Sequence, residues 1–182
     1  AVFGTKYGSI DTRFKRSDKK DFIEIPEGTA HFLEHKLFES EEGDAFNRFA
    51  KLGASPNAFT SFDKTSYLFA CSDNFKETLE ILLDMVSTPY FTPETVAKEQ
   101  GIIGQEIGMY DDSPEDLVHE LLQKNVWENH ALGYIISGEK SVVSAMTREQ
   151  IVDYMKLHYC GSNMVISIAG NYDETAVLDN LN

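Results

Sequence analysis

The chain has 182 residues, of which 42% are hydrophobic and 25% charged, and its formal net charge is −14. This composition is typical of one globular domain with a real core, and no apolar run reaches the length of a membrane span. Phosphate binding needs a basic face, so the acidic balance argues against nucleic acid and favours basic peptides or metal cations. We therefore expect neither nucleic acid nor a membrane as a partner.

The two cysteines, Cys71 and Cys160, are far apart in the sequence, and neither belongs to a C-x-x-C pair. Isolated thiols favour a reducing compartment over a disulfide framework. We expect a cytoplasmic protein, with the mitochondrial matrix as the alternative. The chain has no repeats and no Pro/Ser-rich linker, so we expect residues 1–182 to form a single domain.

The first third of the chain predicts a strand at residues 2–10 and then a charged loop at residues 11–21. In "GTAHFLEHKLFES", Thr29 is expected to cap a helix with apolar positions on one side. Those inward positions are Phe32, Leu33, Leu37 and Phe38. A second amphipathic helix is expected at residues 42–53, where Gly53 ends it.

The remaining elements follow from hydrophobic periodicity and from capping residues. Aromatic and β-branched residues predict two strands joined by a turn within residues 57–72. Further helices are expected at residues 74–89, from Pro93 after a Thr92 cap, at residues 113–127, and at residues 147–159 after a capping box of Thr147 and Gln150. A buried strand is expected at residues 163–171. Without strict βα alternation, this order predicts an α+β fold, with helices layered on one face of a mixed, largely antiparallel sheet.

An H-x-x-E-H pattern places His31, Glu34 and His35 on the first predicted helix. Residues four apart lie on one helix face, so both imidazoles can reach one point and suit a tetrahedral zinc ion. Glu34 can lie beside such an ion without binding it and take a proton from a water molecule on the ion. The alternative is a pair of surface histidines on an amphipathic helix.

A catalytic zinc ion needs a third protein ligand. On the helix that begins at Pro93, Glu99 and Glu106 are seven residues apart, about two turns, and so share a face. Gly101, Gly104 and Gly108 each weaken this helix, which suggests the close approach of another backbone and a helix that aims Glu106 at the metal. The alternative for both glutamates is a polar helix face.

Three stretches, "GTAHFLEH", "GASPNAFTSFDKTSYLFA" and "KEQGIIGQEIGMYDD", resemble the pitrilysin or insulinase family of inverzincin metallopeptidases. This family includes insulin-degrading enzyme and mitochondrial processing peptidase, and the resemblance covers nearly the whole chain. It implies that Zn²⁺ is the cofactor, that His31, His35 and Glu106 are its ligands, and that Glu34 is the general base. It also implies that Glu99 supports the catalytic site from behind the ligands.

The resemblance further implies a peptide substrate that adds a strand to the edge strand containing Asn57, Ala58 and Phe59. An ordinary core hairpin is the alternative, above all for Phe59. Relatives of this kind enclose the substrate between a zinc-bearing domain and a second, related domain without the motif. We therefore expect residues 1–182 to be the N-terminal catalytic half of a longer protein, truncated at both ends.

The predicted function is that of a zinc endopeptidase that hydrolyses peptides or small unfolded polypeptides. One alternative is a non-catalytic or weakly active substrate-binding subunit of a two-part peptidase. The other is a non-peptidase zinc enzyme with the same inverted motif, such as S-ribosylhomocysteinase, in which a cysteine is the third ligand. Cys71 or Cys160 would then have to supply that ligand.

Overall fold

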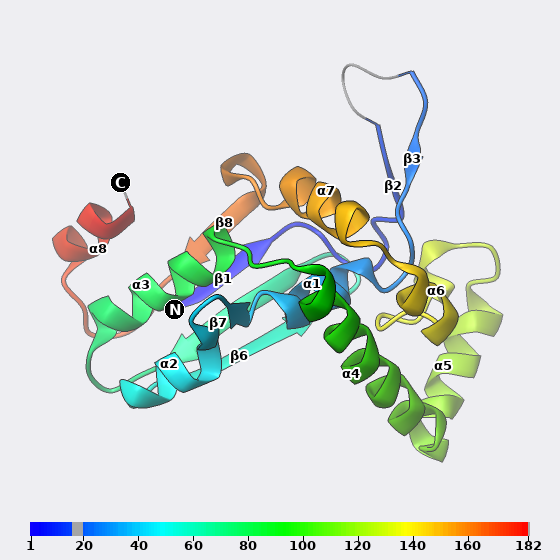
Figure 1. The fold of residues 1–182 in the computed structure, drawn as a ribbon, viewed down its shortest axis with the longest axis horizontal. Helices are drawn as coiled ribbons and strands as arrows, with labels where there is room; N and C mark the ends of the chain where they lie inside the picture. The colour runs from blue at the N-terminus through cyan, green and yellow to red at the C-terminus, as the bar shows by residue number, and fades with distance from the viewer. Residues whose placement is uncertain (16–19, 182) are drawn as a thin grey trace.

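A four-stranded sheet organises the computed structural model, which describes residues 1–15 and 20–181 (Figure 1). Its strand order is β6-β7-β1-β8, and every neighbouring pair is antiparallel. The strands are β1 (Val2–Thr5), β6 (Ser55–Thr60), β7 (Thr65–Ala70) and β8 (Met164–Ser167). The predicted α+β class with a largely antiparallel sheet is confirmed, and β6 and β8 are the two edges of this sheet.

Two short ladders lie outside the main sheet. β2 (Arg13–Phe14) pairs with β3 (Ile23–Glu24), and β4 (Glu39–Ser40) pairs with β5 (Gly43–Asp44). The prediction of a loop throughout residues 11–21 is therefore wrong at β2, while residues 16–19 of that segment lie outside the described residues.

The six predicted helices are present in the predicted order as α1 to α5 and α7, and α6, α8 and two short 3₁₀ turns are present in addition to them. The α-helices are α1 (Thr29–Lys36), α2 (Ala45–Lys51), α3 (Phe75–Ser87), α4 (Pro93–Asp111), α5 (Pro114–Val126), α6 (Lys140–Ala145), α7 (Arg148–His158) and α8 (Glu174–Leu181), with η1 (Ala131–Gly133) and η2 (Gly161–Asn163) as the 3₁₀ turns. The predicted caps of α4 and α7 are confirmed, because the Thr92 and Thr147 hydroxyls accept bonds from the backbone N–H groups of Thr95 and Gln150. Among the described residues, no helix is both long enough and apolar enough to cross a membrane.

The start of α1 differs from the prediction, because Gly28 and not Thr29 is the capping residue. Gly28 has φ 81°, and a Cβ atom there would lie 2.5 Å from the carbonyl oxygen of Ser137. The Thr29 hydroxyl instead donates to the carbonyl of Pro26 at 2.6 Å. The glycine is thus required by a neighbour more than 100 residues away, and this contact fixes the start of the helix that carries the H-x-x-E-H pattern.

The core lies between one face of the sheet and the helices, as predicted. Alternate strand residues Phe3, Tyr67 and Phe69 are buried on the face that α1 and α3 cover (Figure 1). On the opposite face, Val2 is 39% exposed and Val165 70% exposed. The prediction of a fully buried strand at residues 163–171 is therefore wrong, since β8 has only one covered face.

The glycines of α4 do not mark a close approach of another backbone. The prediction of such an approach, which was made because glycine destabilises a helix, is therefore wrong. A Cβ atom at Gly101 or Gly108 would have no described neighbour within 4 Å outside the helix. At Gly104 the nearest atom would belong to the Lys140 side chain, at 3.4 Å. Helix α4 nevertheless packs beside α1 and aims Glu106 at the histidines.

Candidate metal centre

Three potential ligands from two helices converge on one point. His31 and His35 are one turn apart on α1, and Glu106 reaches them from α4, so that one ligand atom of each lies within 4.8 Å of the others. The Nε2 atoms of His31 and His35 lie 3.6 Å and 3.2 Å from the two oxygens of Glu106.

These separations fit zinc. A tetrahedral zinc ion at its usual 2.0–2.2 Å from nitrogen and oxygen holds its ligand atoms about 3.3–3.6 Å apart. Two imidazoles and one carboxylate leave the fourth position of such an ion open, as in catalytic zinc sites. Neither cysteine belongs to this cluster among the described residues, so the cysteine-ligand alternative finds no support in the structure.

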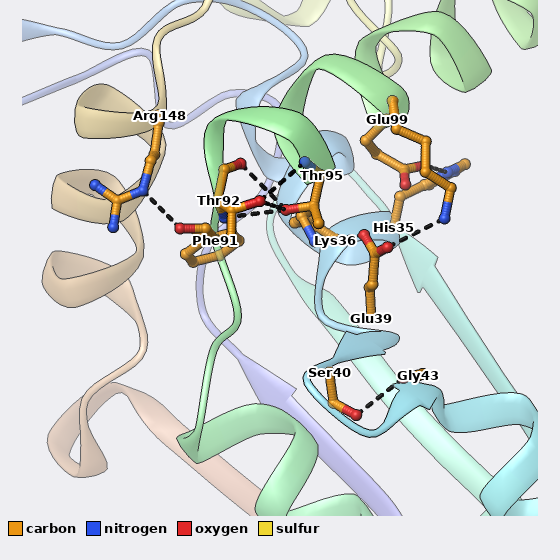
Figure 2. A network of polar contacts seen from close by, with 11 residues as sticks. His35, Lys36, Glu39, Ser40, Gly43, Phe91, Thr92, Thr95, Glu99 and Arg148 are labelled. Atoms are coloured by element: carbon orange, nitrogen blue, oxygen red, sulfur yellow. Dashed lines mark hydrogen bonds and ion pairs between the residues drawn. The ribbon is translucent and has the colours of Figure 1, made fainter.

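Glu99 lies behind His35 on the side opposite to Glu106. Its Oε1 atom is 3.1 Å from His35 Nδ1, and the residue is only 6% exposed (Figure 2). A proton on Nδ1 that is donated to Glu99 leaves Nε2 free to face the cluster. Glu99 is therefore placed to fix the tautomer and the ring orientation of His35, and its supporting role stays a prediction.

The electrostatics of the cluster suit a cation. Burial and, after it, the neighbouring His35 lower the pKa of His31 to about 4, although Glu106 and Glu99 oppose the shift. Burial also opposes the charged form of His35, but hydrogen bonds to Glu106 and Glu99 outweigh it and raise the pKa of His35 to about 10. The hydrogen bond from His35 lowers the pKa of Glu106 despite its partial burial. The buried carboxylate of Glu99 and the half-buried carboxylate of Glu106 thus hold one proton on His35, in a place where a divalent ion would supply the positive charge instead.

Glu34 lies in the same cleft without belonging to the ligand cluster. Burial raises the pKa of Glu34, although the Thr60 hydroxyl, which donates to Glu34 Oε2 at 2.7 Å, opposes this shift. A carboxyl group whose pKa is raised toward neutrality is suited to accept and return a proton.

Sequence reasoning missed two hydroxyl groups that hold the site. Thr60, at the end of β6, orients Glu34, and Tyr110 donates to Glu106 Oε1 at 3.1 Å. Tyr110 is four residues after Glu106 on the same helix, so its spacing could have revealed it. Thr60 could be found only after the position of β6 relative to α1 was known.

Two clefts meet at the cluster and share Glu34 and His35, and the second of them is lined by all three potential ligands. The first cleft has a volume of about 420 Å³, and its apolar lining is Phe38, Phe46, Ala58 and Ile102. The second cleft has a volume of about 440 Å³, and α5 lines it with Asp116, His119, Glu120 and Gln123. The site is therefore a groove that extends to both sides of the ligand cluster.

The edge strand β6 borders this groove, and its residues are placed differently from one another. Asn57 and Ala58 line the first cleft, where Asn57 Oδ1 accepts a bond from the backbone N–H of Ala58 at 2.9 Å. Phe59 is 43% exposed, and strand alternation places its side chain on the sheet face away from Glu34. Substrate contacts of all three residues remain predictions, and those of Phe59 would have to use its backbone.

A comparison with known families gives a match over most of the chain. The family described as insulinase, peptidase family M16, matches residues 23–140. The chain belongs to this family. The matched residues include the whole ligand cluster, Glu34, Glu99 and the edge strand β6.

Similar M16 proteins are known from bacteria and from mitochondria. "Uncharacterized zinc protease YmfH" of Bacillus subtilis (strain 168) is 47% identical over 178 residues, which are 98% of this chain and 42% of that protein. The beta subunit of human mitochondrial-processing peptidase is 31% identical over 157 residues, or 84% of this chain and 32% of that protein. The crystal structure of a putative M16-like peptidase from Alicyclobacillus acidocaldarius superposes with a TM-score of 0.94 at 39% identity, and covers 99% of this chain and 42% of that chain. The chain thus spans about two fifths or less of the length of these M16 proteins.

Proposed function

We propose that this M16 chain is a zinc endopeptidase domain that hydrolyses peptides or small unfolded polypeptides. The observation that carries the proposal is the convergence of three ligand side chains, the separate carboxylate of Glu34 and the free edge strand β6 on one groove. The zinc proteases among its relatives support the peptidase class.

His31, His35 and Glu106 would hold the zinc ion, with Glu99 behind His35. A zinc ion held by these residues would lower the pKa of a bound water and would place a positive charge near the carbonyl oxygen of the substrate. Glu34, aligned by Thr60, takes the proton of the attacking water and returns it to the amine that leaves. The raised pKa of Glu34 favours the first of these steps, because a more basic carboxylate takes a proton from water more readily.

The substrate would bind as an added strand on β6. An edge strand offers unpaired backbone groups in a fixed array, so pairing does not depend on the side chains of the peptide. Asn57, which bonds the Ala58 N–H, would give up this contact when a peptide carbonyl takes its place. Broad acceptance of unfolded segments follows from this mode of binding.

The second candidate is a non-catalytic or weakly active substrate-binding subunit of a two-part peptidase. One relative is by its name a subunit of a peptidase, and the chain covers only part of each relative, so we also propose a second, related M16 domain as the partner. Such a domain would lie on the same chain or on another one. The intact set of three ligands and Glu34 favours the catalytic role for this domain.

The test compares metal content with hydrolysis. Glu34→Gln is expected to keep the zinc stoichiometry of the wild type and to lose peptide hydrolysis, because the base is removed and the ligands remain. His31→Ala, His35→Ala and Glu106→Gln are expected to lose zinc first and activity with it. Full hydrolysis by Glu34→Gln would contradict the role of Glu34, and zinc binding of wild-type strength by Glu106→Gln would contradict its role as a ligand.

A further inference from the structure

Two consecutive residues at the end of α1 are tied to two consecutive residues of α4. His35 bonds Glu99 at 3.1 Å, while Lys36 Nζ bonds Glu39 Oε2 at 2.7 Å and the other oxygen of Glu39 accepts from Lys98 at 3.1 Å. Figure 2 shows His35 with Glu99 and, beside them, Lys36 and Glu39. The first link touches a zinc ligand directly, and the second runs parallel to it without touching the cluster.

Lys36 is buried to an unusual degree for a lysine, with an exposed fraction of 0%. Lysine is almost never fully buried unless it is paired, because a charged ammonium loses its hydration there. Here Glu39 supplies the opposite charge, and the rings of Tyr90 and Phe91 lie 6.0 Å and 5.7 Å from Nζ. An apolar side chain could fill the same space without a charge to compensate, so packing alone does not explain a lysine at this position.

Two of the contacts of Lys36 are with the segment that precedes α4. Tyr90 and Phe91 form the link that leads into α4, and the carbonyl of Phe91 is held by Arg148 at 2.6 Å. Glu39 extends the connection to Lys98, one residue before Glu99. The ammonium thus connects the end of α1 both to the start of α4 and, through Glu39, to its second turn.

The position of α4 relative to α1 decides both contacts of His35, because Glu99 and Glu106 are on the same helix. A rotation or a shift of α4 would lengthen both contacts at once. Metal and catalytic sites tolerate displacements of only about 0.5 Å before their geometry is lost. The buried Lys36 ammonium holds Glu39 in place, and Glu39 bonds Lys98 of α4, whose side chain is 61% exposed; this directional chain of charges opposes such a shift.

We propose that Lys36 is a positioning residue of the metal centre: through Glu39 and Lys98 it holds α1 and α4 at the separation at which His35 meets Glu99 and Glu106 together. The inference rests on the proposed zinc site. It assigns Lys36 no contact with substrate or metal.

The first experiment measures zinc affinity of Lys36→Met by competition with a chelator, and records the visible spectrum of the Co²⁺-substituted protein. Methionine keeps the length and the apolar stem of lysine. We expect the zinc dissociation constant to rise about 10–100-fold, as for the loss of other outer contacts of metal ligands, and the Co²⁺ bands to change. The matched control is Lys124→Met on α5, which breaks an exposed ion pair with Glu139. It should leave the zinc affinity and the Co²⁺ spectrum unchanged.

The second experiment separates positioning from general stability. In Lys36→Met/Glu39→Met no buried charge is left unpaired, so thermal stability should return to near that of the wild type. The zinc affinity should remain reduced, because the link to Lys98 is still absent. If Lys36→Met does not fold, the double variant decides the question alone.

Two results would overturn the inference while leaving the proposed function in place. One is wild-type zinc affinity and an unchanged Co²⁺ spectrum in Lys36→Met, and the other is full recovery of zinc affinity in the double variant. Failure of the wild-type chain to take up zinc is a different outcome, because it would overturn the proposed function and this inference with it.

Discussion

His35 is the residue on which the geometry of the metal centre depends, because it contacts a carboxylate at each ring nitrogen. Glu99 lies 3.1 Å from Nδ1, and Glu106 lies 3.2 Å from Nε2. One of these carboxylates is a proposed ligand, and the other fixes the ring. Their effects on a bound metal should therefore differ in size, since loss of a ligand removes a metal bond and loss of a supporting residue only loosens one.

Glu99→Gln is expected to weaken zinc binding and turnover by about 10–100-fold without emptying the site. The amide can still accept the Nδ1 proton, but it lacks the negative charge that strengthens the bond. Zinc affinity and kcat measured on the same preparation check this expectation. Glu94→Gln, an exposed change at the start of the same helix, serves as the control. Unchanged affinity and turnover in Glu99→Gln would show that Glu99 has no role at the site.

His158, which lies outside the metal centre, is expected to make the stability of the fold depend on pH. Its ring stacks on Tyr7 at 3.9 Å, and its buried Nε2 atom has no hydrogen-bond partner among the described residues. Burial lowers the pKa of His158, although Asp11 opposes this shift. In the unfolded chain His158 takes up a proton near pH 6.5, whereas in the folded chain it stays neutral at that pH. The free energy of unfolding therefore falls as the pH is lowered through 6.5.

The expected result is a smaller acid loss of stability in His158→Phe, which keeps an aromatic ring against Tyr7. The free energy of unfolding in urea, measured at pH 7.5 and pH 5.5 for both proteins, gives the comparison. The other titrating groups are common to both proteins and cancel in the difference. Equal losses in the two proteins would show that His158 does not titrate differently in the folded and unfolded states.

Helices α1 and α4 show at the scale of elements what a sequence can reveal. The spacing of His31 and His35 and the Thr92 cap depend on neighbours within a few residues, and both were predictable. The start of α1 at Gly28 was not, because the contact that demands glycine comes from Ser137. The exposure of β8 was not predictable for a similar reason, since its apolar residues do not show that one face of the sheet lacks a covering layer.

Two glycine substitutions should change stability in opposite directions. Gly101→Ala is expected to raise the free energy of unfolding by about 0.5–1 kcal/mol, because alanine favours the helix and its Cβ meets no described atom within 4 Å. Gly28→Ala should lower it, since φ 81° is unfavourable for alanine and the new atom would lie 2.5 Å from Ser137 oxygen. Urea denaturation of the metal-free proteins measures both. A destabilised Gly101→Ala would mean that another backbone does approach α4.

At the scale of the whole molecule, apolar surface is left uncovered on α5 and on one face of the sheet. None of the residues of α5 is buried, and Val118 and Leu122 are 63% and 60% exposed. The sheet face opposite to α1 exposes Val165 and Phe59. Helical or strand periodicity is the same whether an apolar face is covered by its own domain or by another, so the sequence could predict these elements but not their exposure.

The last prediction is that this M16 domain alone cleaves peptides feebly. Its groove lacks an arginine among the described lining residues, and the Tyr110 hydroxyl is already bonded to Glu106, so these residues offer no free Arg/Tyr pair for the developing oxyanion. Each missing donor costs about 10²–10³ in rate. We therefore expect the 182-residue chain to bind zinc normally, and we expect kcat/KM to rise at least about 100-fold when the proposed second M16 domain is added as a separate polypeptide. Hydrolysis of a fluorogenic peptide, with Glu34→Gln in the same mixture as the blank, measures this rise. Turnover by the isolated chain that the second domain does not increase would show that this domain completes its active site by itself.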